Sequence, residues 1–178
     1  MRVIAGSLKG RRLKTPTWEG LRPTSDKLRE TLFNILAPWI AGASVVDAYA
    51  GTGAVGIEAL SRGASRVSFI ERDRRAQALI AANLAHCGVP PDAYVIIRAS
   101  VGRALADLHP ASFDIMILDP PYDQPVDAVL AVAAARLAPG GVLVVEHARR
   151  QPAPDRAGAL PRSREVTSGD SALALYLA

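Results

Sequence analysis

The stretch at residues 45–56, Val-Val-Asp-Ala-Tyr-Ala-Gly-Thr-Gly-Ala-Val-Gly, most constrains how this chain can fold. An apolar run ends at Asp47, a glycine-rich turn follows, and a helical pattern begins after the turn, which together predict strand, loop and helix. Gly51 and Gly53 allow a tight turn that approaches a ligand closely, and Gly56 allows the helix to pack against the strand. Amide groups at the start of the helix can bind polar groups. The stretch therefore predicts a cradle for a nucleotide-like ligand.

From residue 44 onward, short apolar runs alternate with amphipathic segments. We expect strands over 44–48, 66–71, 93–97, 113–118 and 141–146, and helices over 55–62, 74–86, 101–108 and 126–137. Continuous apolar strands separated by helices favour a parallel sheet that is covered on both faces. Two further segments, 163–167 and 172–177, predict an antiparallel hairpin. The expected fold class is α/β, a Rossmann-like, mostly parallel seven-stranded sheet with a C-terminal antiparallel hairpin.

Residues 1–40 are expected to form a basic extension of a catalytic domain at 41–178. The extension holds eight Lys or Arg and three Asp or Glu, a net charge of +5, whereas the remaining 138 residues carry −1. Residues 1–6 and 9–15 predict a hairpin, and Thr24 is expected to cap a helix that runs to about Ala37. From charge alone, a polyanionic partner bound through phosphates and a solvated basic face explain this segment equally well.

Composition makes several protein classes improbable. The longest apolar runs have the length of strands, far below the roughly 20 residues of a membrane span. The N-terminus has no uninterrupted apolar core typical of a signal peptide, and a single cysteine, Cys87, fits a reducing cytosol and a small buried side chain. The three histidines show no spacing typical of metal ligands. We therefore expect a cytoplasmic protein without a metal.

Two cofactor classes fit the glycine turn. The sequence Gly51 to Gly56 matches G-x-G-x-x-G, and Glu71 lies 20 residues after Gly51, where a carboxylate can accept both hydroxyl groups of a ribose. This pattern suits NAD equally well. Asp47, four residues before the first glycine, is placed to bind the amino group of S-adenosylmethionine. The alternatives without function are a capped strand end for Asp47 and a surface carboxylate for Glu71.

The stretch Phe113 to Tyr122 decides between these cofactors, because an apolar strand leads there into Asp-Pro-Pro-Tyr. An exocyclic amino nitrogen is a poor nucleophile, since its lone pair is conjugated into the base. The Asp119 carboxylate and the Pro120 carbonyl can accept its two hydrogens and direct the nitrogen toward a methyl group. The prolines fix the turn, and Tyr122 can stack on the base. The pattern favours amino-nitrogen methylation over hydride transfer, and a rigid Pro-Pro turn with a surface tyrosine is the alternative without function.

The chain resembles the bacterial 16S ribosomal RNA guanine-N2 methyltransferases along almost its whole length. The matching segments are Arg2 to Gly6, Gly10-Arg11, Arg22-Pro23-Thr24, Asp26, Arg29-Glu30, Phe33 to Leu36, Asp47, Ala50 to Gly53, Gly56 to Ala64, Glu71, Asn83, Asp119 to Tyr122, Gly169-Asp170-Ser171 and Tyr176. The glycine turn and Asp-Pro-Pro-Tyr recur in many methyltransferases. The discriminating segments are therefore the Arg-Pro-Thr helix start and Leu-Ser-Arg-Gly-Ala at residues 60–64.

The resemblance implies methyl transfer from S-adenosylmethionine to N2 of one guanine in 16S rRNA, by a monomer acting on the small ribosomal subunit. It implies catalytic residues Asp119, Pro120, Pro121 and Tyr122; cofactor-binding residues Asp47, Ala48, Tyr49, Gly51, Gly53, Glu71, Arg72, Ser100 and Asp119; and RNA-binding residues Arg2, Lys9, Arg11, Arg12, Arg22, Thr24, Lys27 and Arg29. Ala99-Ser100 replaces the Gly-Asp that often contacts adenine in such enzymes, and Ser168 replaces a common aromatic residue.

Three other functions remain open at this point. An amino methyltransferase that acts on N6 of adenine in DNA or another RNA shares the catalytic motif, although DNA enzymes usually carry a separate target-recognition region. A protein glutamine methyltransferase shares the motif too, but gains nothing from the +5 segment. A binding module with an inactive cofactor fold is disfavoured by the intact Asp47, Glu71 and Asp-Pro-Pro-Tyr.

Overall fold

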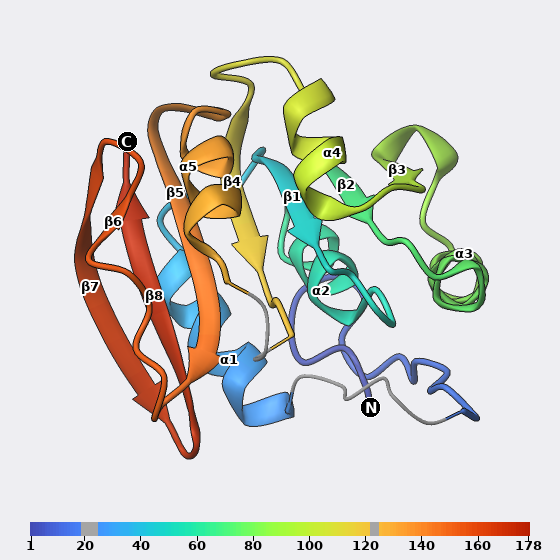
Figure 1. Cartoon of the computed structure of the whole chain (residues 1–178). Helices are drawn as coiled ribbons and strands as arrows, with labels where there is room; N and C mark the ends of the chain where they lie inside the picture. The colour runs from blue at the N-terminus through green and yellow to red at the C-terminus, as the bar shows by residue number, and fades with distance from the viewer. Residues whose placement is uncertain (19–24, 122–124) are drawn as a thin grey trace.

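The computed structural model describes residues 1–18, 25–121 and 125–178 (Figure 1). The strands are β1 (Ser44–Ala48), β2 (Arg66–Ile70), β3 (Tyr94–Ile97), β4 (Phe113–Leu118), β5 (Leu137–Ala148), β6 (Arg156–Ala157), β7 (Leu160–Ser168) and β8 (Ser171–Leu177). The helices are α1 (Asp26–Leu36), α2 (Ala54–Ser61), α3 (Arg74–Cys87), α4 (Val101–Asp107) and α5 (Asp127–Ala134), with a short 3-10 helix η1 (Pro91–Ala93). None of the helices in the described residues is long and apolar enough to cross a membrane.

The strands form one sheet in the order β3-β2-β1-β4-β5-β8-β7-β6. Strands β1 to β5 pair in parallel, and β8 inserts antiparallel between β5 and β7. This arrangement confirms the predicted Rossmann-like α/β class. The described residues contain eight strands rather than seven, because the two-residue β6, for which no strand was expected, pairs with β7. The strand order reverses between β1 and β4, where ligands bind in such sheets.

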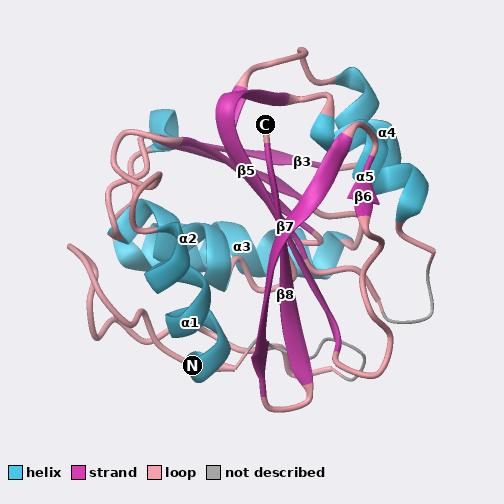
Figure 2. Cartoon of the chain, turned by 90° about the vertical axis from the view of Figure 1, so that its left-hand side faces the viewer, coloured by secondary structure: helices cyan, strands magenta, loops and turns pink. Residues whose placement is uncertain are grey.

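Each face of the sheet is covered by helices (Figure 2). Alternate residues of each strand point to opposite faces, so neighbours such as Val45 and Val46 belong to different apolar clusters. Helices α1, α2 and α3 pack on the first face, and α4 and α5 pack on the second. The central strands are mostly apolar because both faces of the sheet are buried. Cys87 is buried in the first cluster, as predicted.

In the N-terminal arm, residues 1–15, the two ends pair antiparallel as the expected hairpin requires: Arg2 bridges Arg12, and the Val3 amide donates to the Arg11 carbonyl at 2.9 Å. Between these ends, side chains of α2 bind the backbone of the arm. The buried carboxylate of Glu58 accepts hydrogen bonds from the Ile4 and Ala5 amides at 2.7 and 3.0 Å. The Ser61 hydroxyl accepts one from the Leu8 amide at 2.9 Å. These bonds fix the arm to the catalytic domain.

Asn83 of α3 ties the end of the arm to the glycine turn. Its side-chain oxygen accepts a hydrogen bond from the Lys14 amide at 2.8 Å, and its amide nitrogen donates to the carbonyls of Lys14 and Thr52 at 3.2 and 3.0 Å. The Asn83 side chain is fully buried, and a buried amide group without hydrogen bonds would lower the stability of the fold. These bonds therefore satisfy its polar atoms.

Helix α1 begins at Asp26, and its cap is Ser25 rather than Thr24, which lies outside the described residues. The Ser25 hydroxyl accepts a hydrogen bond from the Leu28 amide at 3.2 Å. Leu28, Leu32 and Leu36 are buried in the same cluster as β1, β4 and β5. The helix therefore belongs to the core of the catalytic domain. At the other end of the chain, the helix expected over 126–137 stops earlier, because Leu137 already pairs with Phe113 in the sheet.

Candidate active site

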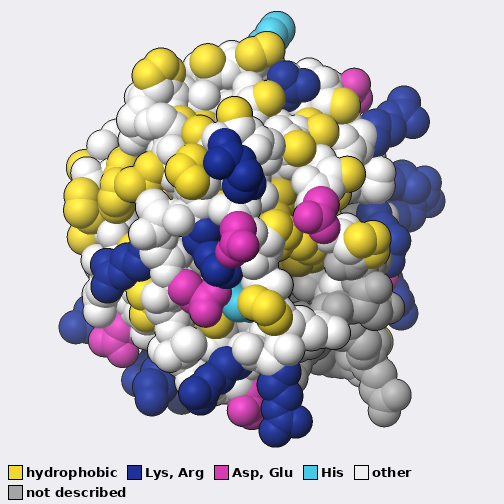
Figure 3. Space-filling view, turned by 60° about the vertical axis from the view of Figure 1, so that its left-hand side comes forward, with side chains coloured by type: hydrophobic (Ala, Val, Ile, Leu, Met, Phe, Trp, Pro, Cys, Tyr) yellow, Lys and Arg dark blue, Asp and Glu magenta, His cyan; other side chains and the backbone are white. Residues whose placement is uncertain are grey.

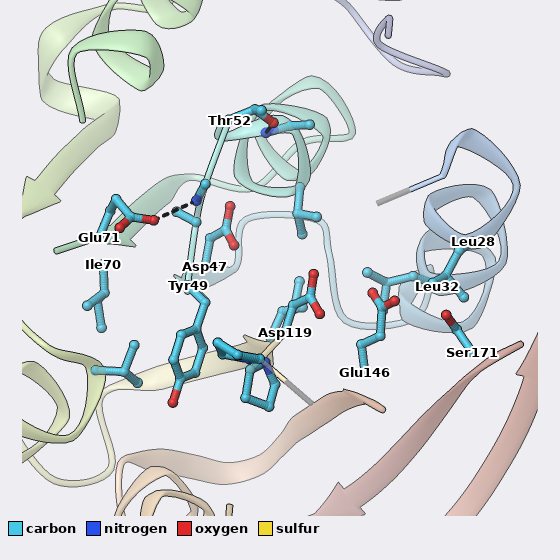
Figure 4. A pocket seen from close by; sticks show the side chains of 18 of the residues that line it. Leu28, Leu32, Asp47, Tyr49, Thr52, Ile70, Glu71, Asp119, Glu146 and Ser171 are labelled. Carbon is cyan, nitrogen blue, oxygen red and sulfur yellow. Dashed lines mark hydrogen bonds between the residues drawn. The ribbon is translucent and has the colours of Figure 1, made fainter. Parts of the chain in front are cut away.

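A cavity of about 920 Å³ lies at the carboxyl ends of β1, β4 and β5, beside the point where the strand order reverses. Its volume is in the range of sites for small molecules and cofactors. The glycine turn, Glu71 and Ser100 line one half. Asp119, Glu146, α1 and the β7–β8 turn line the other half, as Figure 4 shows in part. The volume therefore suits a cofactor-sized ligand, and Asp119 lines the same cavity as the glycine turn.

The glycine turn has the predicted form. Gly51 and Gly53 both have positive φ, +55° and +75°, which only glycine adopts at little cost. Gly56 lies against β2, and a Cβ atom at this position would come within 2.2 Å of the Phe69 ring. The helix therefore approaches the sheet closely, and the backbone of the turn borders the cavity directly.

Glu71 is held by backbone amides beside this turn. One carboxylate oxygen accepts a hydrogen bond from the Gly51 amide at 3.0 Å, and the other accepts one from the Asp73 amide at 2.8 Å (Figure 4 draws the bond to Gly51). Each carboxylate oxygen has two lone pairs, so each keeps one for a ligand. Glu71 is thus a rigid acceptor suited to a pair of ribose hydroxyls, in agreement with its predicted place.

Asp47 is a buried carboxylate under the helix start. Its side chain accepts a hydrogen bond from the Gly56 amide at 2.8 Å, and the residue is 3% exposed. Burial raises the pKa of Asp47 from 3.8 to about 8; the hydrogen bond from Gly56 opposes this rise, and the charges of Asp119 and Glu71 add to it. A cationic ligand group would favour the ionised carboxylate. Asp47 thus fits the predicted contact with an amino group.

Asp119, Pro120 and Pro121 follow β4 and line the cavity as predicted. Tyr122 lies outside the described residues. Tyr49 lines the same space and has φ +63°, an uncommon conformation for a residue with a side chain. Burial raises the pKa of the Tyr49 hydroxyl. The ends of β1 and β4 therefore bring one strained aromatic residue and two carboxylates to one cavity.

Three carboxylates lie on the same face of three adjacent strands. Asp47 pairs with Ile117 across β1 and β4, and Ile117 pairs with Val144 across β4 and β5. Asp119 and Glu146 follow these partners by two residues and hence share their face. This face carries α1, α2 and α3, so the cavity lies between the sheet and α1.

Of the four remaining predicted cofactor residues, two line the cavity and two do not. Arg72 and Ser100 line it. Ala48 instead points to the opposite face of the sheet and is buried in the second apolar cluster, because it neighbours Asp47 on one strand. Gly53 is buried behind the turn, where its amide donates to the Ala50 carbonyl at 2.7 Å. Ala48 and Gly53 shape the site without lining it.

The predicted RNA-binding residues occupy different environments. Arg2, Lys9, Arg11 and Arg12 are exposed on the arm, and Lys27 is exposed at the rim of the cavity. Arg22 and Thr24 lie outside the described residues. On the face seen in Figure 3, Lys and Arg side chains gather along the lower and right-hand edges. Exposed cations are therefore found beyond the arm as well.

Arg29 differs from the other residues expected to bind RNA, because it lies in the interior and not on the surface of α1. Its side chain is fully buried, and one terminal nitrogen donates to the Arg2 carbonyl at 2.8 Å and to Asp26 at 2.7 Å. Burial lowers the pKa of Arg29, whereas the carboxylates of Asp26 and Glu58 raise it. Arg29 fastens the arm to α1 and is not placed to contact RNA.

No site role was predicted for four residues on the second half of the cavity: Leu28, Leu32, Glu146 and Ser171. Glu146 at the carboxyl end of β5 is 8% exposed, and Leu28, Leu32 and Ser171 lie near it (Figure 4). One signal was available for Glu146, because it follows an apolar strand as Asp119 follows β4. Leu28 and Leu32 gave no such signal, since apolar residues on a helix face usually indicate core.

The donors and acceptors of the first half of the cavity fit S-adenosylmethionine. Glu71 offers acceptors for ribose hydroxyls, Asp47 offers a carboxylate for an amino group, and the backbone of the turn can approach closely. Within residues 1–18, 25–121 and 125–178, no three His, Cys, Asp or Glu side chains are grouped as metal ligands would be.

The chain is similar to known proteins over nearly its full length. Residues 1–177 match the family described as Conserved hypothetical protein 95. YlbH of Bacillus subtilis, provisionally named an rRNA methyltransferase, is 38% identical over 181 residues, which cover 99% of this chain and 98% of YlbH. Ribosomal RNA small subunit methyltransferase D of Haemophilus influenzae is 40% identical over 123 residues, covering 68% of this chain and 64% of that protein. The structure of Escherichia coli yhhF, provisionally named a methyltransferase, aligns with a TM-score of 0.86 at 33% identity and covers 99% of this chain and 97% of yhhF.

Proposed function

The chain belongs to the Conserved hypothetical protein 95 family, and from this premise we propose that it methylates ribosomal RNA of the small subunit with S-adenosylmethionine. The finer proposal is that the acceptor is the N2 amino group of one guanine in 16S rRNA. One observation carries the proposal of methyl transfer: Asp119 and the rigid acceptor Glu71 line the same cavity at the point where the strand order reverses. The names of the relatives, which refer to rRNA methyltransferases, support the substrate class.

The residues of the first half of the cavity bind and orient the cofactor. Glu71 accepts hydrogen bonds from the ribose, and Asp47 binds the amino group of the methionine end. When bound, S-adenosylmethionine supplies an electrophilic methyl group, whose bond to sulfur breaks as the bond to the amino nitrogen forms. The glycine turn allows this ligand to lie against the backbone at the start of α2.

The residues after β4 prepare the amino nitrogen for attack. The Asp119 carboxylate and the Pro120 carbonyl accept its two hydrogens, which orients the nitrogen and stabilises the positive charge that develops on it. The nitrogen then releases one proton to water, so no strong base is needed before transfer. Placing two acceptors in a cavity that is partly shielded from solvent strengthens both hydrogen bonds relative to water.

The basic arm, in this proposal, contacts RNA phosphates next to the cavity. Asn83 joins the arm to the glycine turn through Lys14 and Thr52, so RNA held on the arm is positioned relative to the cofactor. Lys9, Arg11 and Arg12 are exposed there.

The double variant Lys9→Ala, Arg12→Ala is expected to weaken binding to the small subunit. It is also expected to reduce the slope of log affinity against log salt concentration by about 1 to 2, because fewer counterions are released on binding when phosphate contacts are lost. Binding measured at four salt concentrations checks this prediction. The matched control is Arg66→Ala, Arg103→Ala, which removes two exposed cations from β2 and α4. Equal slopes for the two double variants would show that the arm is only a solvated basic surface.

Methyl incorporation tests the function itself. Small subunits that lack this modification are incubated with the protein and methyl-labelled S-adenosylmethionine, and the RNA is digested to nucleosides. We expect label in N2-methylguanosine. Label in N6-methyladenosine would support the alternative adenine methyltransferase and overturn the guanine assignment. Label in DNA or protein acceptors, with none in RNA, would overturn the substrate class.

A further inference from the structure

We propose that Glu146 selects guanine as the target base by accepting the hydrogen bond of its N1–H group while Asp119 holds the adjacent N2 amino group. This inference rests on the proposed function, because it assumes that an amino nitrogen of a base enters the cavity. It adds a residue that distinguishes guanine from the other bases with amino groups.

The sheet places the two carboxylates side by side. Leu118 of β4 pairs with Val145 of β5 in parallel register, so Asp119 and Glu146 follow at the same level on neighbouring strands, which lie about 4.8 Å apart in such sheets. Both residues line the cavity. In Figure 4 the Glu146 carboxylate lies between Asp119 and Ser171. Two hydrogen-bond acceptors therefore stand next to each other, as a base edge with two adjacent donors requires.

The burial of Glu146 limits what it can recognise. The residue is 8% exposed, and Leu28, Leu32 and Leu173 line the same part of the cavity. A carboxylate has two oxygens and several lone pairs, so it can accept a hydrogen bond from a ligand in the cavity in addition to its contacts within the protein. A base that offers a donor to Glu146 gains a strong hydrogen bond, whereas a base that offers an acceptor meets repulsion.

Guanine is the only standard base that presents the required edge. Its N2 amino group is next to N1–H, which is a donor. The N6 amino group of adenine is next to N1, and the N4 amino group of cytosine is next to N3, and both of these ring nitrogens are acceptors. An ionised carboxylate is an acceptor only. Glu146 beside Asp119 therefore accommodates guanine and disfavours adenine and cytosine.

The apolar residues of the second half complete the slot. Leu28 and Leu32 come from α1, and Leu173 comes from β8, the strand that pairs with β5 at Glu146. Their side chains can contact the faces of a planar base that has left its stack. They contribute contact area without distinguishing one base from another, so discrimination falls to the carboxylates.

The test uses 2-aminopurine, which keeps an amino group at position 2 but has an acceptor at N1. Small subunits are reconstituted with either guanine or 2-aminopurine at the target position, and kcat/KM for methyl transfer is measured on both. The unchanged protein is expected to prefer guanine by at least about 100-fold, since a site built for an N–H group rejects an analogue without it. Glu146→Gln is expected to reduce this preference to less than about tenfold, because the amide can donate to N1.

Two further variants separate selection from a structural role. Glu165→Gln makes the same change on β7, where Glu165 contacts Arg162 and His147, and is expected to keep the full preference. Glu146→Asp retains the carboxylate and is expected to keep guanine preferred, although at a lower rate. Cofactor affinity and Tm are measured for each variant as a check on folding.

The outcomes are distinct. An equal fall in kcat/KM on both bases for Glu146→Gln would overturn the proposal and leave Glu146 a structural residue. A preference that Glu146→Asp loses as completely as Glu146→Gln would also overturn it. If the unchanged protein methylates no guanine but does methylate adenine, the proposed function fails, and the inference about Glu146 fails with it.

Discussion

Asp119→Ala is expected to lower kcat by about 10²–10³-fold or more while leaving the affinity for S-adenosylmethionine nearly unchanged. The carboxylate acts on the amino nitrogen, whose positive charge develops only in the transition state, so its loss affects the rate more than binding. Cofactor contacts persist, because Glu71 is held by the Gly51 and Asp73 amides and not by Asp119. Single-turnover kinetics and titration calorimetry measure the two quantities separately.

The two controls for Asp119→Ala also replace an aspartate. Asp92→Ala removes an exposed carboxylate in η1 and is expected to change neither quantity. Asp119→Asn keeps one acceptor oxygen without the charge and is expected to retain more activity than Asp119→Ala. If Asp119→Ala lost cofactor binding, Asp119 would be a cofactor ligand first, and its assignment to the amino nitrogen would be wrong.

The parts of the fold that the sequence predicted best are buried on both sides. The boundaries of β1 and β4 agree with the prediction at both ends, because the buried apolar residues Val45-Val46 and Ile115 to Leu118 mark these strands clearly in the sequence. The residues after these strands, Asp119 and the glycine turn, were predicted in place for the same reason. Parallel strands bring their carboxyl ends to one edge, so neighbouring motifs meet without knowledge of the side-chain packing.

The antiparallel pairing of the ends of the arm was predicted, but its attachment to α2 was not, because those partners are distant in sequence. The Ile4 and Ala5 amides bond to Glu58, more than 50 residues away. A helical glutamate ordinarily indicates an exposed side chain, so nothing local reveals this contact. Arg29 is a partly similar case, because its side chain donates to the distant Arg2 carbonyl as well as to the nearby Asp26.

Glu146 illustrates a different reason for a missed residue. Its position after an apolar run was visible, yet the run was expected to end at this residue, whereas β5 continues to Ala148 by pairing with β8. The partner strand lies about 30 residues further along the chain. The second half of the cavity is thus assembled from α1, β5 and β8, and only the structure brings these elements together.

Asp47→Asn is expected to weaken S-adenosylmethionine binding by at least tenfold and, in the cofactor-free protein, to raise stability at alkaline pH. The folded protein raises the pKa of Asp47 from 3.8 to about 8, so the folded state binds this proton more tightly than the unfolded state. The contribution of Asp47 to stability is therefore fully present below about pH 3.8 and declines as the pH rises toward 8. Asparagine does not ionise and removes this loss.

Thermal unfolding without cofactor at pH 6 and pH 9 measures the effect. The advantage of Asp47→Asn over the unchanged protein is expected to grow between these pH values by roughly 1–3 kcal/mol, which corresponds to several degrees in Tm. The Gly56 amide keeps its acceptor, since the asparagine carbonyl oxygen can replace the carboxylate oxygen. Asp92→Asn, at an exposed site, is the matched control and is expected to show the same Tm difference at both pH values.

The two readouts of Asp47→Asn answer separate questions. A Tm advantage that does not grow with pH would show that the buried carboxylate is not destabilising when ionised. Undiminished cofactor affinity would show that Asp47 does not bind the amino group. If both expected results occur, the ionised Asp47 costs folding stability in the free protein and gains its cationic partner only when S-adenosylmethionine binds, so the site is destabilised in advance for the ligand it holds.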